Sequence, residues 1–305
     1  MSLSERNRKM KRETPIFTGV GTAIVTPFKN GKIDYEAYGK MIEFQIAGGV
    51  DSIVVCGTTG EAATLTDEEH RDIIAYTVKQ VNKRVPVIAG TGSNDFAYAV
   101  DLSRHACEVG ADALLHVTPY YNKTSQKGIV EYFSKIADAC SKPVILYNVP
   151  SRTGVNISID AYRALAKHPN IIATKEACGN LSFIVELMEA VGDDIDVYCG
   201  NDDQIVPMMS VGSAGVISVL SNVMPKETAD LTHLYLEGKC KESAKLQLKL
   251  LKLINALFMT VNPIPVKTAL NMMGMCDIEM RLPLCPMTEA ENEKLFNILK
   301  DYGLI

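Results

Sequence analysis

The chain has 305 residues, of which 47% are hydrophobic and 22% are charged, and its formal net charge is −5. This acidic balance disfavours nucleic-acid binding, because phosphate recognition requires clustered Lys and Arg side chains. No apolar run reaches the roughly 18 residues that cross a bilayer, and none resembles a signal peptide, so we expect a cytoplasmic protein with a small-molecule partner, no nucleic acid and no membrane.

The chain begins with a basic segment that has no apolar partner face. Five basic side chains fall within its first 13 residues: Arg6, Arg8, Lys9, Lys11 and Arg12. A targeting signal would need an apolar or amphipathic stretch beside them. We therefore predict a flexible N-terminal tail over residues 1–15.

From Thr18 onward one pattern repeats: a short run rich in Val and Ile, a loop, and a longer stretch with helical spacing. Short runs that are apolar on both faces are typical of parallel strands covered by helices. The predicted strands span 18–25, 51–56, 85–90, 112–117, 143–147, 171–175, 195–199 and 214–219. The predicted helices lie near 34–48, 67–82, 95–109, 125–141, 158–167, 180–191 and 202–211. Thr66 and Glu69 have the spacing of a capping box at the start of the second helix.

Eight successive βα units favour an α/β fold of the (β/α)8 TIM barrel type over an open doubly wound sheet. No G-x-G-x-x-G motif opens the first helix, which disfavours dinucleotide binding. Beyond the eighth strand only helices are predicted, near 226–238, 240–259, 264–273 and 288–302. The first of these closes the barrel. We therefore predict a barrel domain over 16–238 and a C-terminal helical appendage over 239–305.

Lys175 ends the predicted sixth strand, Ile171-Ile172-Ala173-Thr174-Lys175. Chemistry in barrels collects at the carboxyl ends of the strands. An ammonium that leaves an apolar strand is poorly hydrated, which favours the neutral amine that attacks carbonyl groups. A solvated lysine that merely caps the strand is the commoner role for such a residue taken alone.

Two further strand ends carry polar groups suited to an anionic substrate. The second strand ends in Gly57-Thr58-Thr59-Gly60-Glu61, a tight turn whose N–H groups and hydroxyls can face a carboxylate or a phosphate. The fifth strand ends in Tyr147-Asn148-Val149-Pro150-Ser151-Arg152-Thr153-Gly154, where Arg152 offers a fork that matches a carboxylate. An ordinary turn and a surface arginine are the alternatives.

Three of the chain's twelve tyrosines fall on two neighbouring loops, because Tyr120 and Tyr121 follow the fourth strand and Tyr147 ends the fifth. A phenol and a second hydroxyl can share and pass a proton, so Tyr147, Thr58 and a nearby tyrosine form a candidate proton relay. Packing at an interface is the competing account of Tyr121, and it does not exclude the chemical role.

Metal and cofactor chemistry lack support. The eight cysteines form no C-x-x-C pair, there is no H-E-x-x-H motif, and none of the five histidines follows a predicted strand together with a carboxylate. Asn201-Asp202-Asp203 follows the seventh strand and brings negative charge where phosphate-binding barrels place glycines. We expect no metal and no cofactor, and cysteines that stay reduced in the cytosol.

Lys175 together with the Y-N-V-P-S-R-T-G and G-T-T-G-E motifs resembles the pyruvate-dependent class I aldolases and, among them, the dihydrodipicolinate synthases. The resemblance covers the chain from about Gly19 to its end. It implies the condensation of pyruvate with L-aspartate 4-semialdehyde in diaminopimelate and lysine biosynthesis. N-acetylneuraminate lyases are the nearest alternative, and Arg152 in the form P-S-R-T-G favours the synthases. A catalytically idle barrel that binds an amino acid as a regulator is disfavoured, because the reactive residues are all present.

The resemblance also implies a role for each catalytic residue. Lys175 would form the Schiff base with pyruvate. Tyr147 would act as general acid and base, in a relay with Thr58 and with Tyr121 supplied by a neighbouring subunit. A residue that acts across an interface requires at least a dimer, and the family resemblance implies a homotetramer built as a dimer of dimers.

The same resemblance implies how the substrates are bound. Thr58 and Thr59 would hold the pyruvate carboxylate, and Arg152 would receive the carboxylate of the semialdehyde. The backbone of Gly200 and of Ile217 would lie beside the lysine.

Lysine-inhibited relatives bind L-lysine at a dimer interface. The matching residues that are compatible here are Ala62, Ala63, Leu65, His70, Asn94 and Tyr120. This chain has Asp67 where those relatives have a histidine and Tyr98 where they have a glutamate. That glutamate would bind the effector's ammonium, a charge-assisted contact worth about 1.5 to 3 kcal/mol. We therefore expect weak or absent feedback inhibition by L-lysine.

Overall fold

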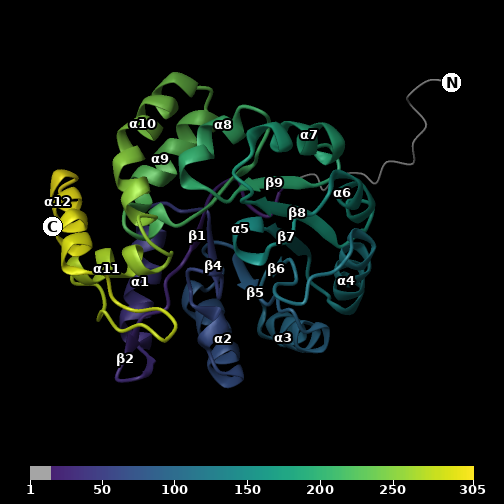
Figure 1. Cartoon of the computed structure of the whole chain (residues 1–305), viewed down its shortest axis with the longest axis horizontal. Coiled ribbons are helices and arrows are strands. Elements are labelled where there is room, and N and C mark those ends of the chain that lie inside the picture. The colour runs from purple at the N-terminus through teal and green to yellow at the C-terminus, as the bar shows by residue number, and fades with distance from the viewer. Residues whose placement is uncertain (1–14) are drawn as a thin grey trace.

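The computed structural model describes residues 15–305, so the predicted tail over 1–15 lies, apart from Pro15, outside the described residues. Eight parallel strands close into a barrel in the order β1-β10-β9-β8-β7-β6-β5-β4 (Figure 1). The barrel strands are β1 (Gly19–Ala23), β4 (Ser52–Val55), β5 (Val87–Gly90), β6 (Ala113–Val117), β7 (Val144–Asn148), β8 (Ile171–Glu176), β9 (Asp196–Cys199) and β10 (Gly215–Ser218). The predicted (β/α)8 barrel is confirmed.

The barrel interior is filled by a cluster of buried side chains, among them Ile145, Tyr147, Ala173, Tyr198 and Ile217. They come from neighbouring strands, as expected where alternate residues of each strand point inward. In the parallel register Tyr147 of β7 pairs with Lys175 of β8, and Lys175 pairs with Tyr198 of β9. The sixth-strand lysine therefore lies between two tyrosine-bearing strands.

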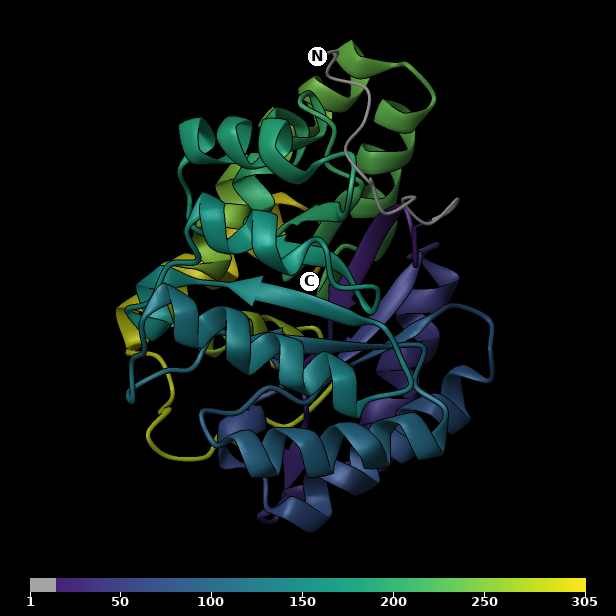
Figure 2. The ribbon, with the colours of Figure 1, turned by 90° about the vertical axis from the view of Figure 1, so that its right-hand side faces the viewer.

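Helices cover the outside of the barrel, and each follows its strand as predicted. They are α1 (Tyr35–Ala47), α2 (Asp67–Val81), α3 (Phe96–Val109), α4 (Gln126–Ala139), α6 (Ile159–Leu165), α7 (Leu181–Val191), α8 (Ile205–Met209) and α9 (Pro225–Leu236). Figure 2 shows the blue helices of the first half of the chain at the bottom and the green helices around residues 225–257 at the top. The capping box of Thr66 and Glu69 is present at the start of α2. Each side chain bonds to the other residue's backbone N–H, which satisfies two donors that the first helical turn leaves free.

Three local features differ from the sequence prediction. The helix expected over 202–211 is split into η2 (Asp202–Gln204) and α8, which puts Pro207 in a first helical turn, where its missing N–H costs little. The loop after β7 contains the short helix α5 (Pro150–Thr153), with Pro150 at its first position. An unpredicted hairpin joins β2 (Phe28–Lys29) to β3 (Lys32–Ile33). Its turn residues Asn30 and Gly31 both have positive φ, the conformation that an Asn-Gly hairpin turn requires.

The appendage consists of α10 (Cys240–Leu257), α11 (Ile264–Met272) and α12 (Glu289–Asp301), and Figure 1 shows α12 in yellow at the edge of the molecule. Buried residues of the appendage, such as Leu253 and Leu299, belong to the same hydrophobic cluster as Ile53 of the barrel. The boundary between residues 238 and 239 falls between α9 and α10, and the division into two domains stays a prediction.

The burial of His116 leads to a prediction of how the free energy of unfolding depends on pH. The Nε2 atom of His116, on β6, lies 3.0 Å from Thr91 Oγ1 and 3.1 Å from Ser103 Oγ, and burial lowers the pKa of His116 to about 3. The unfolded chain binds this proton below a pH of about 6.5, whereas the folded chain does not. The free energy of unfolding should therefore fall by about 1.4 kcal/mol for each pH unit below 6.5, down to the folded pKa.

Urea unfolding between pH 7 and pH 5 checks this expectation. His116→Asn removes the titrating group, so its stability should fall less steeply with acid than that of the wild type. His105→Asn, which removes a partly buried histidine of α3, is the control. Equal slopes for His116→Asn and the wild type would contradict the assignment.

Candidate active site

A cavity of about 630 Å³ lies at the carboxyl ends of the barrel strands. Its lining includes Thr58 after β4, Tyr147 on β7, Arg152 on the short helix α5, and Asn262 from the appendage. A concave site of this size, with a few convergent polar groups, suits a small molecule. The cavity therefore unites the second-strand and fifth-strand motifs that the sequence analysis singled out.

Lys175 is the penultimate residue of β8 and is only 6% exposed. Its Nζ atom lies 4.6 Å from the centre of the Tyr147 ring, a cation–π distance, and the same tyrosine lines the cavity. Lys175 itself is not part of the lining, so its amine lies beside the cavity wall. The predicted position at the strand's carboxyl end is confirmed.

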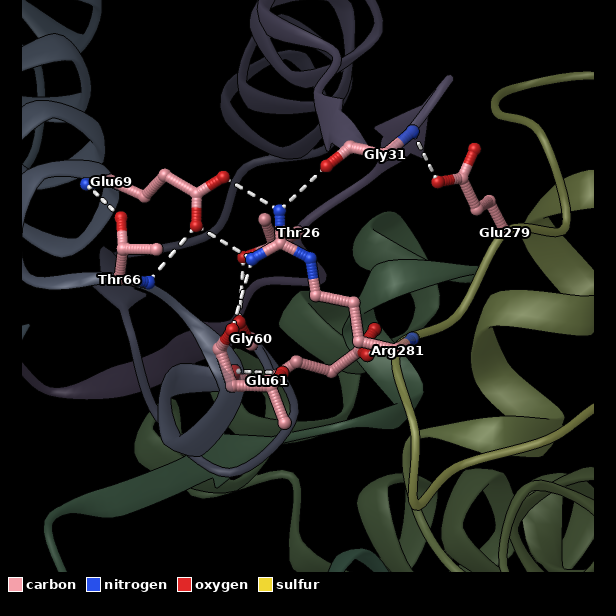
Figure 3. Close-up of polar contacts among 9 residues, drawn as sticks. Thr26, Gly31, Gly60, Glu61, Thr66, Glu69, Glu279 and Arg281 are labelled. Carbon is pink, nitrogen blue, oxygen red and sulfur yellow. Dashed lines mark hydrogen bonds and ion pairs between the residues drawn. The ribbon is translucent and has the colours of Figure 1, made fainter.

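The turn Gly57–Glu61 is held by its own backbone and by the barrel. Gly60 N donates to Gly57 O at 3.1 Å and Glu61 N donates to Thr58 O at 3.1 Å. Thr26 Oγ1 donates to Gly60 O at 2.7 Å (Figure 3). Glu61 adopts a left-handed backbone with a φ of 55°, which lets the chain reverse sharply after the threonines.

The two threonines of this turn face different surroundings. Thr58 lines the cavity, whereas Thr59 is buried and its Oγ1 atom accepts a hydrogen bond from Asn262 Nδ2 at 3.0 Å. Arg152, on the opposite loop, donates through Nη2 to Asn262 O at 3.0 Å. Asn262 therefore contacts both the Gly57–Glu61 turn and Arg152.

Gly200 lies beside Lys175, and Ile217 lies in the barrel interior. A Cβ atom on Gly200 would lie 3.2 Å from Cε of Lys175 and 2.7 Å from Cβ of Ala177, so the lysine chain packs closely over this glycine. Ile217, on β10, is buried in the interior cluster that also contains Tyr147. A side chain at position 200 would clash with Cβ of Ala177 and crowd the Lys175 chain, which explains a glycine there.

Tyr121 is a predicted catalytic residue that does not line the cavity of its own chain. Its side chain is 93% exposed, and its backbone has a φ of 67°, an uncommon conformation for a bulky residue. The neighbouring Tyr120 lines the cavity. The loop thus presents one tyrosine inward and one outward.

Most residues of the predicted effector site line the same cavity. The lining includes Ala62, Ala63, Leu65, Asp67, His70, Tyr98 and Tyr120. Asn94 is not among them, but its Nδ2 atom donates to Tyr120 O at 3.1 Å. Burial lowers the pKa of His70, and its Nε2 atom lies 2.8 Å from Gly90 O.

Asp67 stands where the lysine-inhibited relatives have a histidine, and its carboxylate already binds Arg71. Arg71 Nε donates to its Oδ2 atom at 2.9 Å. This hydrogen bond lowers the pKa of Asp67, as does a weaker one from Tyr98. The carboxylate is therefore already engaged by a cation of its own chain.

Sequence reasoning missed the contribution of the appendage to the cavity. Its lining residues there are Val261, Asn262, Pro263, Pro283 and Leu284. The bond from Asn262 to Thr59 spans 203 residues, and periodicity and capping report only on neighbours along the chain. A single sequence therefore carries no signal for this wall of the cavity.

Between residues 15 and 305, no three His, Cys, Asp or Glu side chains are grouped as a metal site would require. Over the same residues, no helix has both the length and the apolar character needed to span a bilayer.

Comparison with known proteins places this site in a family. Residues 16–302 match the model of the dihydrodipicolinate synthetase family. The 4-hydroxy-tetrahydrodipicolinate synthase of Acetivibrio thermocellus is 56% identical over 291 residues, which are 95% of this chain and 99% of that protein. The dihydrodipicolinate synthase structure from Thermotoga maritima is 40% identical with a TM-score of 0.94, covering 95% of this chain and 100% of that one.

A further similar structure is a chloride-inhibited dihydrodipicolinate synthase from Acinetobacter baumannii, complexed with pyruvate. It is 43% identical with a TM-score of 0.92, covering 94% of this chain and 99% of that one. These matches extend over the barrel and the appendage alike. The chain is therefore a member of the dihydrodipicolinate synthetase family.

Proposed function

We propose that this chain condenses pyruvate with L-aspartate 4-semialdehyde to form 4-hydroxy-tetrahydrodipicolinate, through a Schiff base on Lys175. The observation that carries the proposal is the buried Lys175 amine, 4.6 Å from the ring centre of Tyr147 at the wall of the cavity. The curated relative from Acetivibrio thermocellus has this activity in its name, and the Acinetobacter baumannii relative was solved with pyruvate.

The chemistry requires an amine, a proton carrier and two carboxylate sites. Lys175 Nζ attacks the ketone of pyruvate, and loss of water leaves a protonated imine. The imine draws electrons from the methyl group, which loses a proton, and the resulting enamine attacks the aldehyde carbon. The amine of the semialdehyde then attacks the imine carbon, closes the ring and releases Lys175. Tyr147 carries protons in these steps as general acid and base, together with Thr58.

The two carboxylates bind at opposite sides of the cavity. The Gly57–Glu61 turn receives the pyruvate carboxylate through Thr58 and Thr59, while the Arg152 fork receives the semialdehyde carboxylate. Asn262 contacts both regions, so their spacing is set by one residue. Arg152 also favours the synthase reaction over that of an N-acetylneuraminate lyase, because a sugar acid has no second carboxylate for it.

Tyr121 completes the relay from a neighbouring subunit, in a homotetramer built as a dimer of dimers. Its outward side chain and left-handed backbone support this role, because strained residues persist where function requires them. A dimer related by a two-fold axis would place each Tyr121 at the cavity of the other chain.

The enzyme works in the cytoplasm. All eight cysteines are free thiols, and two of them, Cys240 and Cys285, are exposed. Exposed thiols stay reduced in a compartment buffered by glutathione and thioredoxin.

Borohydride trapping tests the proposed function. Reduction in the presence of pyruvate should add a 1-carboxyethyl group to the peptide that contains Lys175, and reduction without pyruvate should leave it unmodified. A pyruvate-dependent adduct at another lysine would refute the mechanism. Turnover of aspartate semialdehyde, and not of N-acetylneuraminate, then separates a synthase from a lyase.

Feedback by L-lysine should be weak or absent. Tyr98 cannot supply the carboxylate that an ammonium needs, and Asp67 is engaged by Arg71. An assay across an L-lysine titration measures the effect, and half-inhibition at micromolar lysine would contradict the expectation. Tyr98→Glu should increase the sensitivity, because it restores a charge-assisted contact of about 1.5 to 3 kcal/mol, while Phe96→Glu on the exposed face of the same helix is the control.

A further inference from the structure

Glu61, the last residue of the Gly57–Glu61 turn, forms a buried ion pair with Lys267 of the appendage. Lys267 Nζ donates to Glu61 Oε1 at 2.5 Å, and the two side chains are 0% and 1% exposed. Glu61 ends the turn that carries Thr58 and Thr59, whereas Lys267 lies on α11 of the appendage. Burying two charges costs about as much as their attraction returns, so stability alone is a weak reason for such a pair.

Lys267 is the cationic side chain that pairs with Glu61, because the guanidinium of the neighbouring Arg281 binds other groups. Lys267 Nζ lies 4.1 Å and Arg281 Cζ 4.3 Å from the ring centre of the buried Phe28. The Arg281 guanidinium is engaged elsewhere: both terminal nitrogens donate to the Glu69 carboxylate at 2.6 Å, and one of them also donates to Gly31 O (Figure 3). Toward Glu61, Arg281 offers only its backbone N–H, 3.5 Å from Oε2.

Glu61 is close enough to the substrate site for its charge to matter. It lines the same cavity as Thr58, and its backbone N–H donates to Thr58 O at 3.1 Å. A pyruvate carboxylate bound by the turn would therefore approach a second carboxylate within a poorly screened region. Without a neutralising partner, Glu61 would repel the anion that the turn has to bind.

We propose that Lys267 is a positioning residue for pyruvate, which neutralises Glu61 so that the Gly57–Glu61 turn can accept a carboxylate. This inference rests on the proposed function and assigns a task to the appendage. The start of α11 supports the turn at two points, because Asn262 binds the Thr59 hydroxyl and Lys267 binds Glu61. Lys267 N donates to Pro263 O at 3.0 Å, so both contacts come from one connected segment.

Charge substitutions separate neutralisation from simple support of the turn. Lys267→Met leaves Glu61 uncompensated, so the KM for pyruvate should rise about tenfold. Glu61→Gln removes the repelling charge but keeps an oxygen that accepts from Lys267, so its KM for pyruvate should equal or fall below the wild-type value. The double variant should return to within about threefold of the wild type. The KM for the semialdehyde, bound at Arg152, should stay unchanged throughout.

The outcomes are decisive in either direction. If the pair only supports the turn, Glu61→Gln and Lys267→Met will raise the KM for pyruvate alike, and the double variant will not recover; that result overturns the proposal. If Lys267→Met does not fold, Glu61→Gln decides alone, since a rise of more than about threefold in its KM for pyruvate overturns the proposal and no rise supports it. Lys226→Met, which breaks a surface pair with Asp230, is the control.

Borohydride trapping distinguishes this proposal from the function on which it rests. If the wild type forms no pyruvate adduct on Lys175, the proposed function fails. If the adduct forms and Lys267→Met leaves the KM for pyruvate unchanged, only the role of Lys267 is refuted.

Discussion

Lys175→Ala is expected to lower kcat/KM by about 10⁴-fold or more, because none of the described residues that line the cavity is a lysine that could form the imine instead. The loss should appear in kcat, since the turn at Thr58 and the fork of Arg152 still bind the substrates. A coupled assay measures the rate, and borohydride trapping should find no adduct on the peptide that contained the lysine.

Two variants serve as controls for this experiment. Lys175→Arg keeps a positive charge beside Tyr147 but cannot form a Schiff base, so it should be as inactive as Lys175→Ala. Lys226→Ala removes an exposed lysine of α9 and should keep full activity. If Lys175→Ala retained activity within about tenfold of the wild type, the nucleophile would have to be sought elsewhere.

The barrel could be predicted because its signals are local. Each strand is buried on both faces and therefore reads as a short apolar run, as in Ile171–Glu176, and each helix follows with its own period and cap. The order of the units then fixes which loops meet at one end. For this reason Thr58, Tyr147 and Arg152 could be assigned to one cavity before any coordinates were known.

The contribution of the appendage could not be predicted, because it depends on contacts between distant segments. Lys267 reads in the sequence as an ordinary helical lysine, and only the fold shows that it is fully buried against Glu61, 206 residues away. Likewise, the two-residue strands β2 and β3 are too short to produce a periodic pattern, although they place Phe28 against both Lys267 and Arg281. Long-range electrostatics and very short elements leave no local signature.

Tyr147→Phe is expected to lower kcat by about 10²- to 10³-fold with little change in fold. The phenylalanine ring can still fill the barrel interior and lie beside the Lys175 amine, so only the hydroxyl is lost. Imine formation should slow down but should still be detectable by trapping with pyruvate over long incubation. A variant with wild-type kcat would show that Tyr147 packs against the lysine without carrying protons.

Tyr121→Phe should impair kcat similarly, and combining the two variants tests where Tyr121 acts. If Tyr121 serves the neighbouring chain, a dimer of one Tyr147→Phe chain and one Tyr121→Phe chain has one cavity with both hydroxyls and one with neither. After random mixing by co-expression, about one quarter of all cavities should then be native, and the activity should be well above that of either parent variant. If Tyr121 served its own chain, every cavity in the mixture would lack one hydroxyl and no activity would return. The 93% exposure of Tyr121 favours recovery, because a side chain that points out of its own subunit can act only in a cavity that another subunit brings to it.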